Sequence, residues 1–118
     1  MDATLETEFQ LKIGQTAVFQ DEELEMQFWN LPEDSRCPSD VVCIWEGQAR
    51  CMLRVGKTGE EKQEVEVTSR AGHVDLDRSR FGDYTIDLIA VDPYPVSTAR
   101  IDLENYVITL DVTRTEEK

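Results

Sequence analysis

Two cysteines, a proline, a tryptophan and a glycine fall within residues 34–47, which read DSRCPSDVVCIWEG. Cys37 and Cys43 enclose five residues, a spacing that a turn around Pro38 can close into a disulfide. So small a ring would stabilise by only about 2 to 2.5 kcal/mol in the chain-entropy model, so its main effect would be to fix the shape of the loop. The alternative is a pair of free thiols, since a sequence does not reveal cysteine connectivity.

The third cysteine has a different setting. Cys51 falls in phase with Leu53 and Val55 along an alternating segment, which predicts a small, buried, apolar side chain. A bond between Cys37 and Cys43 would mean that the chain matures in an oxidising compartment. We expect no zinc site, because two cysteines and one distant histidine fall short of the usual four ligands. No cofactor is predicted.

Nucleophilic catalysis would have to use His73, the only histidine of the chain. The side chains that could in principle approach it are Ser35, Ser39, Ser69, Ser79 and Cys51. None of them lies in a nucleophile-elbow context such as Gly-x-Ser-x-Gly. We therefore expect no catalytic residue and no enzyme activity, and a shallow site near His73 is the alternative.

An acidic segment that reads DLDRSRFGD begins at Asp75. Its oxygen-bearing side chains alternate as they do in calcium loops, which makes Asp75, Asp77 and Asp83 the candidate ligands. The segment fails the EF-hand template, because its sixth position is Arg80 rather than glycine and its twelfth is Ile86. Two arginines within it also oppose a cation. An acidic turn closed by ion pairs is the favoured interpretation, and no metal is predicted.

Apolar and polar residues alternate with the period of a β-strand along most of the chain. Such segments lie near residues 9–13, 16–20, 24–28, 49–55, 65–67, 84–90 and 106–112. About seven short strands joined by polar turns predict an all-β fold, an antiparallel two-sheet β-sandwich that is immunoglobulin-like in general shape, with a small barrel as the alternative. We expect one domain over residues 1–118, with its core at about 9–112 and loosely held tails.

Two long loops are the expected contact surface, because binding residues often lie on loops that a rigid scaffold holds. One loop covers Pro32–Gly47 and the other covers Asp92–Asn105. The candidate contact side chains are Arg36, Trp45, Glu46 and Tyr94. Tyr94 stands between two prolines, which keep its backbone extended and suit either recognition or packing.

The first loop also has a purely structural interpretation. Arg36 lies between Asp34 and Asp40, so pairing with a carboxylate could hold the loop in place. Trp45 would then cover the open end of the sandwich, and Gly47 would let the chain bend into the following strand.

The 12 basic and 25 acidic residues give a formal net charge of −13. Such a charge disfavours nucleic acid and anionic membranes as partners. Only four of the basic residues are lysines, and acid-rich, lysine-poor surfaces suit high salt, so a halophilic source is one hypothesis beside an ordinary acidic domain. No apolar stretch is long enough to span a bilayer, and Met1–Glu6 lacks the features of a signal peptide.

The run Asp34–Gly47 resembles the signature of a family of uncharacterised bacterial domains found in lipoproteins and exported proteins. Members show Asp-Ser-Arg-Cys-Pro, a short spacer, and then Val-x-Cys-Ile-Trp-x-Gly, and this chain departs from them at Glu46, where a small residue is expected. The resemblance spans roughly Phe9 to Val112. It implies an exported β-sandwich with a closed cysteine loop, and it implies no activity.

Together these features predict a non-enzymatic binding or structural module that acts outside the cytoplasm, in a periplasmic, secreted or lipid-anchored protein. Its partner would be an unknown protein or small ligand, and a monomer is expected rather than an oligomer. Two alternatives remain open: a calcium-dependent interaction domain, and an enzyme with a site near His73. Neither nucleic-acid binding nor membrane insertion is expected of this chain.

Overall fold

The computed structural model describes residues 2–38, 40, 42, 47–69, 78–92 and 101–114. These residues form eight β-strands and two short 3-10 helices. In chain order they are β1 (Phe9–Lys12), β2 (Thr16–Phe19), η1 (Gln20–Glu22), β3 (Leu24–Asp34), β4 (Ala49–Lys57), β5 (Gln63–Ser69), β6 (Arg78–Phe81), β7 (Tyr84–Asp92), η2 (Leu103–Asn105) and β8 (Val107–Arg114).

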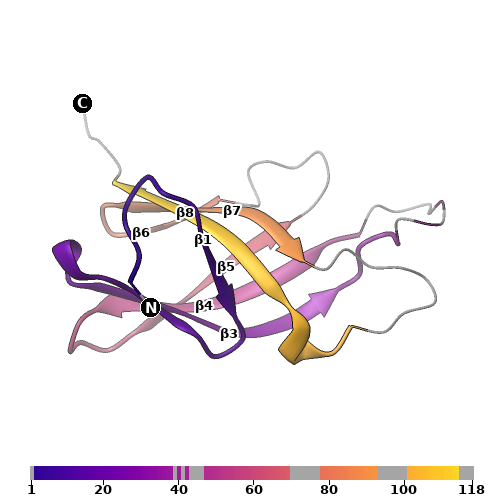
Figure 1. The fold of residues 1–118 in the computed structure, drawn as a ribbon, viewed down its shortest axis with the longest axis horizontal. Helices are drawn as coiled ribbons and strands as arrows, with labels where there is room; N and C mark the ends of the chain where they lie inside the picture. Colours follow the sequence, from indigo (N-terminus) through magenta and orange to yellow (C-terminus); the bar gives the residue numbers. More distant parts are fainter. Residues whose placement is uncertain are drawn as a thin grey trace.

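The strands lie in two antiparallel four-stranded sheets, which pack face to face (Figure 1). One sheet has the order β2-β3-β4-β5 and the other has the order β1-β8-β7-β6. The predicted β-sandwich is therefore confirmed, and the barrel alternative is excluded for the described strands. Most of these neighbours are consecutive in the sequence, whereas immunoglobulin domains use Greek-key connections. The likeness to such domains extends only to the two packed layers.

Alternation along the strands builds the core. In β3, Leu24, Met26 and Phe28 are fully buried, while the intervening Glu25 and Gln27 lie on the outer face. Strand β7 buries Tyr84, Ile86 and Leu88 in the same way. The inner faces of both sheets meet in one apolar cluster, as expected for strands with a single buried face.

Two elements differ from the sequence-based expectation. The structure has β6, which pairs with β7 over Arg78–Phe81, where the sequence suggested an acidic turn. Its residues alternate only between exposed and half-buried, so the segment lacks the apolar alternation that predicts a strand. Strand β3 also continues to Asp34 through a segment expected to be loop. A register shift between Asn30 and Glu33 accommodates Pro32 there, because proline needs no ladder partner at a bulge.

The N-terminal segment, residues 2–6, bridges the two sheets at one open edge. The amide of Ala3 donates to the Val18 carbonyl at 2.9 Å, and the amide of Glu6 donates to the Val112 carbonyl at 2.9 Å. Val18 belongs to β2 and Val112 to β8, so the segment joins one layer to the other. At the opposite edge the Ser79 hydroxyl of β6 donates to the Glu66 carbonyl of β5.

Candidate functional site

A buried ion pair lies where the long loops leave the sandwich. Asp34 ends β3, and Arg36 follows it by two residues. The guanidinium of Arg36 donates to both carboxylate oxygens of Asp34, from Nε to Oδ1 at 2.8 Å and from Nη2 to Oδ2 at 2.9 Å. Their side chains are only 6% and 9% exposed. This two-bond geometry is the strongest form of an arginine–carboxylate contact, and it confirms the predicted pairing of Arg36 with a neighbouring aspartate.

The same pair reaches across to the other sheet. Nη1 of Arg36 donates to the carbonyl of Val91 in β7 at 2.7 Å. The hydroxyl of Tyr106, which directly precedes β8, donates to Oδ2 of Asp34 at 2.6 Å. We call Asp34, Arg36, Tyr106 and the Val91 carbonyl the loop-end clamp. It fixes the bases of both long loops relative to each other, because Asp34 and Arg36 lie in the first loop and Val91 and Tyr106 directly flank the second.

Charge and burial oppose each other at the clamp. Burial acts to raise the pKa of Asp34, but the hydrogen bonds from Arg36 and Tyr106 and the positive charge of Arg36 outweigh it, so this pKa lies below its usual value. Burial, together with the hydrogen bond to Asp34, raises the pKa of Tyr106 to about 12. At neutral pH the clamp therefore contains a carboxylate, a guanidinium and a protonated phenol.

Cys51 of β4 lies close enough to this ion pair to feel both of its charges. It is a free, fully buried thiol, as predicted. Burial raises its pKa to about 12, which removes the thiolate that nucleophilic or metal-binding chemistry would need. Since the chain has three cysteines, an internal disulfide would have to join Cys37 to Cys43.

The first loop is also closed by backbone contacts at its base. The amide of Ser35 donates to the carbonyl of Gln48 at 2.7 Å. Gly47 has φ +68°, and a Cβ placed on it would lie 1.8 Å from the carbonyl oxygen of Ser35. Only glycine fits this close approach, which supports the predicted role of Gly47 as the bend into β4.

At the loop end, apolar and acidic side chains reach solvent. Val42 is 101% exposed and Leu103 is 43% exposed. Asp40, Asp92 and Glu104 are exposed as well. Arg36 does not belong to this surface, because it is 8% exposed and its guanidinium bonds inward. Arg36 is one of the four predicted contact residues. In the structure it instead holds the base of the loop.

The other sequence-predicted site residues have different outcomes. Asp83 is exposed in the turn after β6. Cys37, one half of the candidate disulfide, is half-buried. Seven others lie outside the described residues: Cys43, Trp45, Glu46, His73, Asp75, Asp77 and Tyr94. Within the described ranges no group of three or more histidine, cysteine or acidic residues is arranged to hold a metal ion. The same ranges contain no helix with the length and apolarity needed to cross a membrane.

A second polar cluster joins the sheets at the opposite end. The hydroxyl of Tyr84 donates to Oε1 of Glu22 at 2.8 Å, and the guanidinium of Arg114 donates to the same oxygen. Lys57 donates to the Tyr84 hydroxyl at 3.3 Å and to the Glu22 carbonyl at 3.0 Å. The hydrogen bond from Tyr84 contributes most to a pKa of Glu22 below its usual value. The sequence contained no motif for this cluster, because its members are far apart in the chain.

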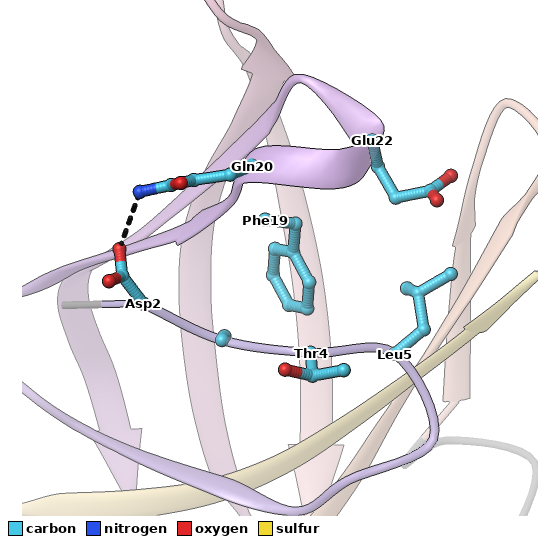
Figure 2. A pocket seen from close by; sticks show the side chains of 7 residues that line it. Asp2, Thr4, Leu5, Phe19, Gln20 and Glu22 are labelled. Atoms are coloured by element: carbon cyan, nitrogen blue, oxygen red, sulfur yellow. Dashed lines mark hydrogen bonds between the residues drawn. The ribbon is translucent and has the colours of Figure 1, made fainter.

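A cavity of about 270 Å³ lies beside this second cluster, between residues 2–5 and residues 19–22. Figure 2 shows Phe19 between the two segments, with Asp2 and Glu22 toward opposite ends of the cavity. Oδ1 of Asp2 accepts a hydrogen bond from Nε2 of Gln20 at 3.0 Å. The alternation pattern gave no signal for this cavity, because the N-terminal segment has no strand period.

Comparison of the chain with protein-family models, with curated proteins and with solved structures gives no significant match.

Proposed function

We propose that this protein is a non-enzymatic binding or structural module that acts outside the cytoplasm, and that its contact face is the loop end of the sandwich. The observation that supports the proposal best is the loop-end clamp. Arg36 and Asp34 form a buried ion pair. Its hydrogen bonds connect the two sheets at the bases of the loops. A pre-positioned loop base lowers the entropy lost on binding.

Burial of the clamp favours a scaffolding role over chemistry. The Asp34 carboxylate accepts from two groups, Arg36 and Tyr106, which opposes its use as a general base. Cys51 is held as a buried thiol. Among the described residues at this end, apolar and acidic side chains are exposed, such as Val42, Leu103 and Glu104. Loops that a rigid scaffold positions often carry binding residues.

The proposal includes the predicted disulfide and the compartment. A bond between Cys37 and Cys43 would close the loop that the clamp holds at its base, and it would form in an oxidising compartment. Non-reducing mass spectrometry of protein taken from its native source, after thiol labelling, tests both points. One labelled cysteine per unfolded chain supports the proposal, and three labelled cysteines contradict it.

The contact face is tested by site-specific photo-crosslinking. A photoreactive amino acid at Tyr94 is compared with the same group at Thr58, an exposed residue of the β4–β5 hairpin at the other end. The probe protein is mixed with the extracytoplasmic fraction of its source. We expect a saturable product from position 94 alone, which excess wild-type protein displaces and Trp45→Ala weakens. Equal products from both positions, or none from position 94, would overturn the proposal.

A further inference from the structure

The cavity between residues 2–5 and 19–22 lies away from the proposed contact face and has the chemistry of a ligand site. Its volume of about 270 Å³ is close to the lower end of the range of about 300–1,000 Å³ seen for small-molecule pockets. We propose that it binds a small organic cation, a primary ammonium group attached to a short apolar or aromatic body. This inference goes beyond the proposed function and does not depend on it.

The apolar part of the cavity comes from three side chains. Phe19 is 1% exposed and closes the inner side, where its ring meets Phe9 edge-on with centroids 5.4 Å apart. Ala3 and Leu5 are half-buried and pack against the core on the other side. A flat or linear hydrocarbon body would cover the exposed parts of Ala3 and Leu5 and remove that apolar surface from water.

The polar part of the cavity selects the charge of the ligand. Its described lining includes the carboxylates of Asp2 and Glu22 and has no basic side chain. Glu22 already pairs with Arg114, so its charge is largely compensated. Asp2 is exposed, and only Gln20 is shown to donate to it, at Oδ1. Oδ2 of Asp2 and the hydroxyl of Thr4 therefore provide acceptors for an ammonium group.

The geometry also limits the length of the ligand. Residues 2–5 span at most about 10 Å in an extended chain, so the ligand has one ammonium end and a body of about the size of a phenyl or short alkyl group. An anion would meet the uncompensated carboxylate of Asp2 and the net charge of −13. A neutral analogue of the same shape would keep the apolar contacts and lose the ionic one.

The test uses three compounds of similar shape and different charge: phenethylammonium, 2-phenylethanol and 3-phenylpropionate. Each is titrated into the full chain, and amide chemical shifts are followed by NMR. We expect saturable shifts confined to residues 2–6 and 18–23. We also expect phenethylammonium to bind more tightly than the alcohol, by up to about fivefold, the factor that corresponds to the upper value of about 1 kcal/mol for an exposed ion pair. The carboxylate should not bind.

Two variants separate the ionic contact from the apolar one. Asp2→Asn keeps the acceptor for Gln20, and it should abolish the preference for the ammonium compound over the alcohol. Leu5→Ala should weaken the ammonium compound and the alcohol by the same factor. Glu60→Gln, which changes the charge equally in an exposed turn outside the cavity, should change nothing.

Several results would overturn the inference. These are equal binding of the three compounds, shifts spread over the acidic surface, an unchanged preference in Asp2→Asn, or an absence of shifts at millimolar concentration. If Leu5→Ala fails to fold, the comparison of Asp2→Asn with Glu60→Gln still decides the question, because neither change removes a buried side chain.

Discussion

Arg36 and Asp34 show how burial decides what a charged side chain can do. On the surface the pair would add little to stability, because water and salt screen it. Here the side chains are 6% and 9% exposed, so each charge depends on its partner. The hydrogen bonds to Val91 and from Tyr106 give the two side chains further partners, and such additional hydrogen bonds are what make a buried ion pair tolerable.

Removing the carboxylate of Asp34 should therefore be costly. Asp34→Asn leaves Arg36 buried without a counter-charge, and we expect a loss of about 3 kcal/mol in the free energy of unfolding. The matched control is Asp87→Asn, because Asp87 pairs with the exposed Arg78 at 2.7 Å and should cost less than about 1 kcal/mol. Urea denaturation measures both values. Similar losses for the two variants would show that the buried ion pair of the clamp contributes no more to stability than an exposed one.

The same carboxylate predicts a pH dependence. The pKa of Asp34 is lower in the folded protein than in the unfolded chain, so the unfolded state binds this proton first as pH falls. The stabilisation is complete above the unfolded pKa and disappears as pH falls through the folded one. The difference in unfolding free energy between wild type and Asp34→Asn should be flat near neutrality and shrink in acid. A difference that persists below both pKa values would refute this.

Tyr106 predicts a loss of stability at alkaline pH. Its pKa is raised to about 12 in the folded protein, against about 10 for an unperturbed tyrosine. The folded state retains the phenolic proton where the unfolded chain has lost it, so stability falls as pH rises from about 10 to about 12. Tyr106→Phe should flatten this limb in alkaline unfolding curves. An identical alkaline limb in the variant would show that the phenol does not titrate in this way.

At the level of elements, the base of the first loop depends on backbone fit. Gly47 and Gly14 both have positive φ, +68° and +83°. A Cβ on Gly47 would lie 1.8 Å from the Ser35 carbonyl oxygen, whereas nothing lies within 4 Å of a Cβ on Gly14. A side chain at Gly14 would therefore meet only backbone strain, whereas a side chain at Gly47 would meet both strain and a steric clash.

Alanine at each position tests this difference. Gly14→Ala should cost only the left-handed backbone strain, about 1–2 kcal/mol. Gly47→Ala should cost at least about 2 kcal/mol more, because the Ser35–Gln48 pairing must move apart. Thermal unfolding of both variants measures the difference. Equal losses would mean that the backbone at the loop base moves to accommodate the added Cβ at no further cost in stability.

The elements also show how far the sequence could predict this structure. The β-sandwich and most strands were predictable, because Leu24, Met26 and Phe28 alternate with polar residues as a half-buried strand requires. Strand β6 was missed, since Arg78–Phe81 has no apolar period and forms by pairing with β7. The pairing of Arg36 with Asp34 was predictable from proximity. The contribution of Tyr106, 72 residues from Asp34, was not, because it depends on how the two sheets pack.

For the whole molecule, the net charge of −13 predicts that salt stabilises the folded state. Screening weakens the repulsion among carboxylates, so the melting temperature should rise between low salt and 1 M sodium chloride, by about 4–8 °C for each kcal/mol gained. Replacing the exposed Glu60, Glu61 and Glu64 with glutamine changes the charge to −10 (−13 plus 3) and should reduce the rise. A protein that is most stable at low salt would exclude the halophilic hypothesis.

The two sheets are joined at each end by a tyrosine–carboxylate contact, Tyr106 with Asp34 and Tyr84 with Glu22. The first contact matters more for the proposed contact face, because it holds the loop bases together. A double-mutant cycle between Asp34→Ala and Tyr106→Phe, followed by urea denaturation, measures that link directly, because each single change removes the hydrogen bond between the two side chains. We predict a coupling free energy of about 1 kcal/mol or more, and additivity within about 0.3 kcal/mol would contradict the clamp.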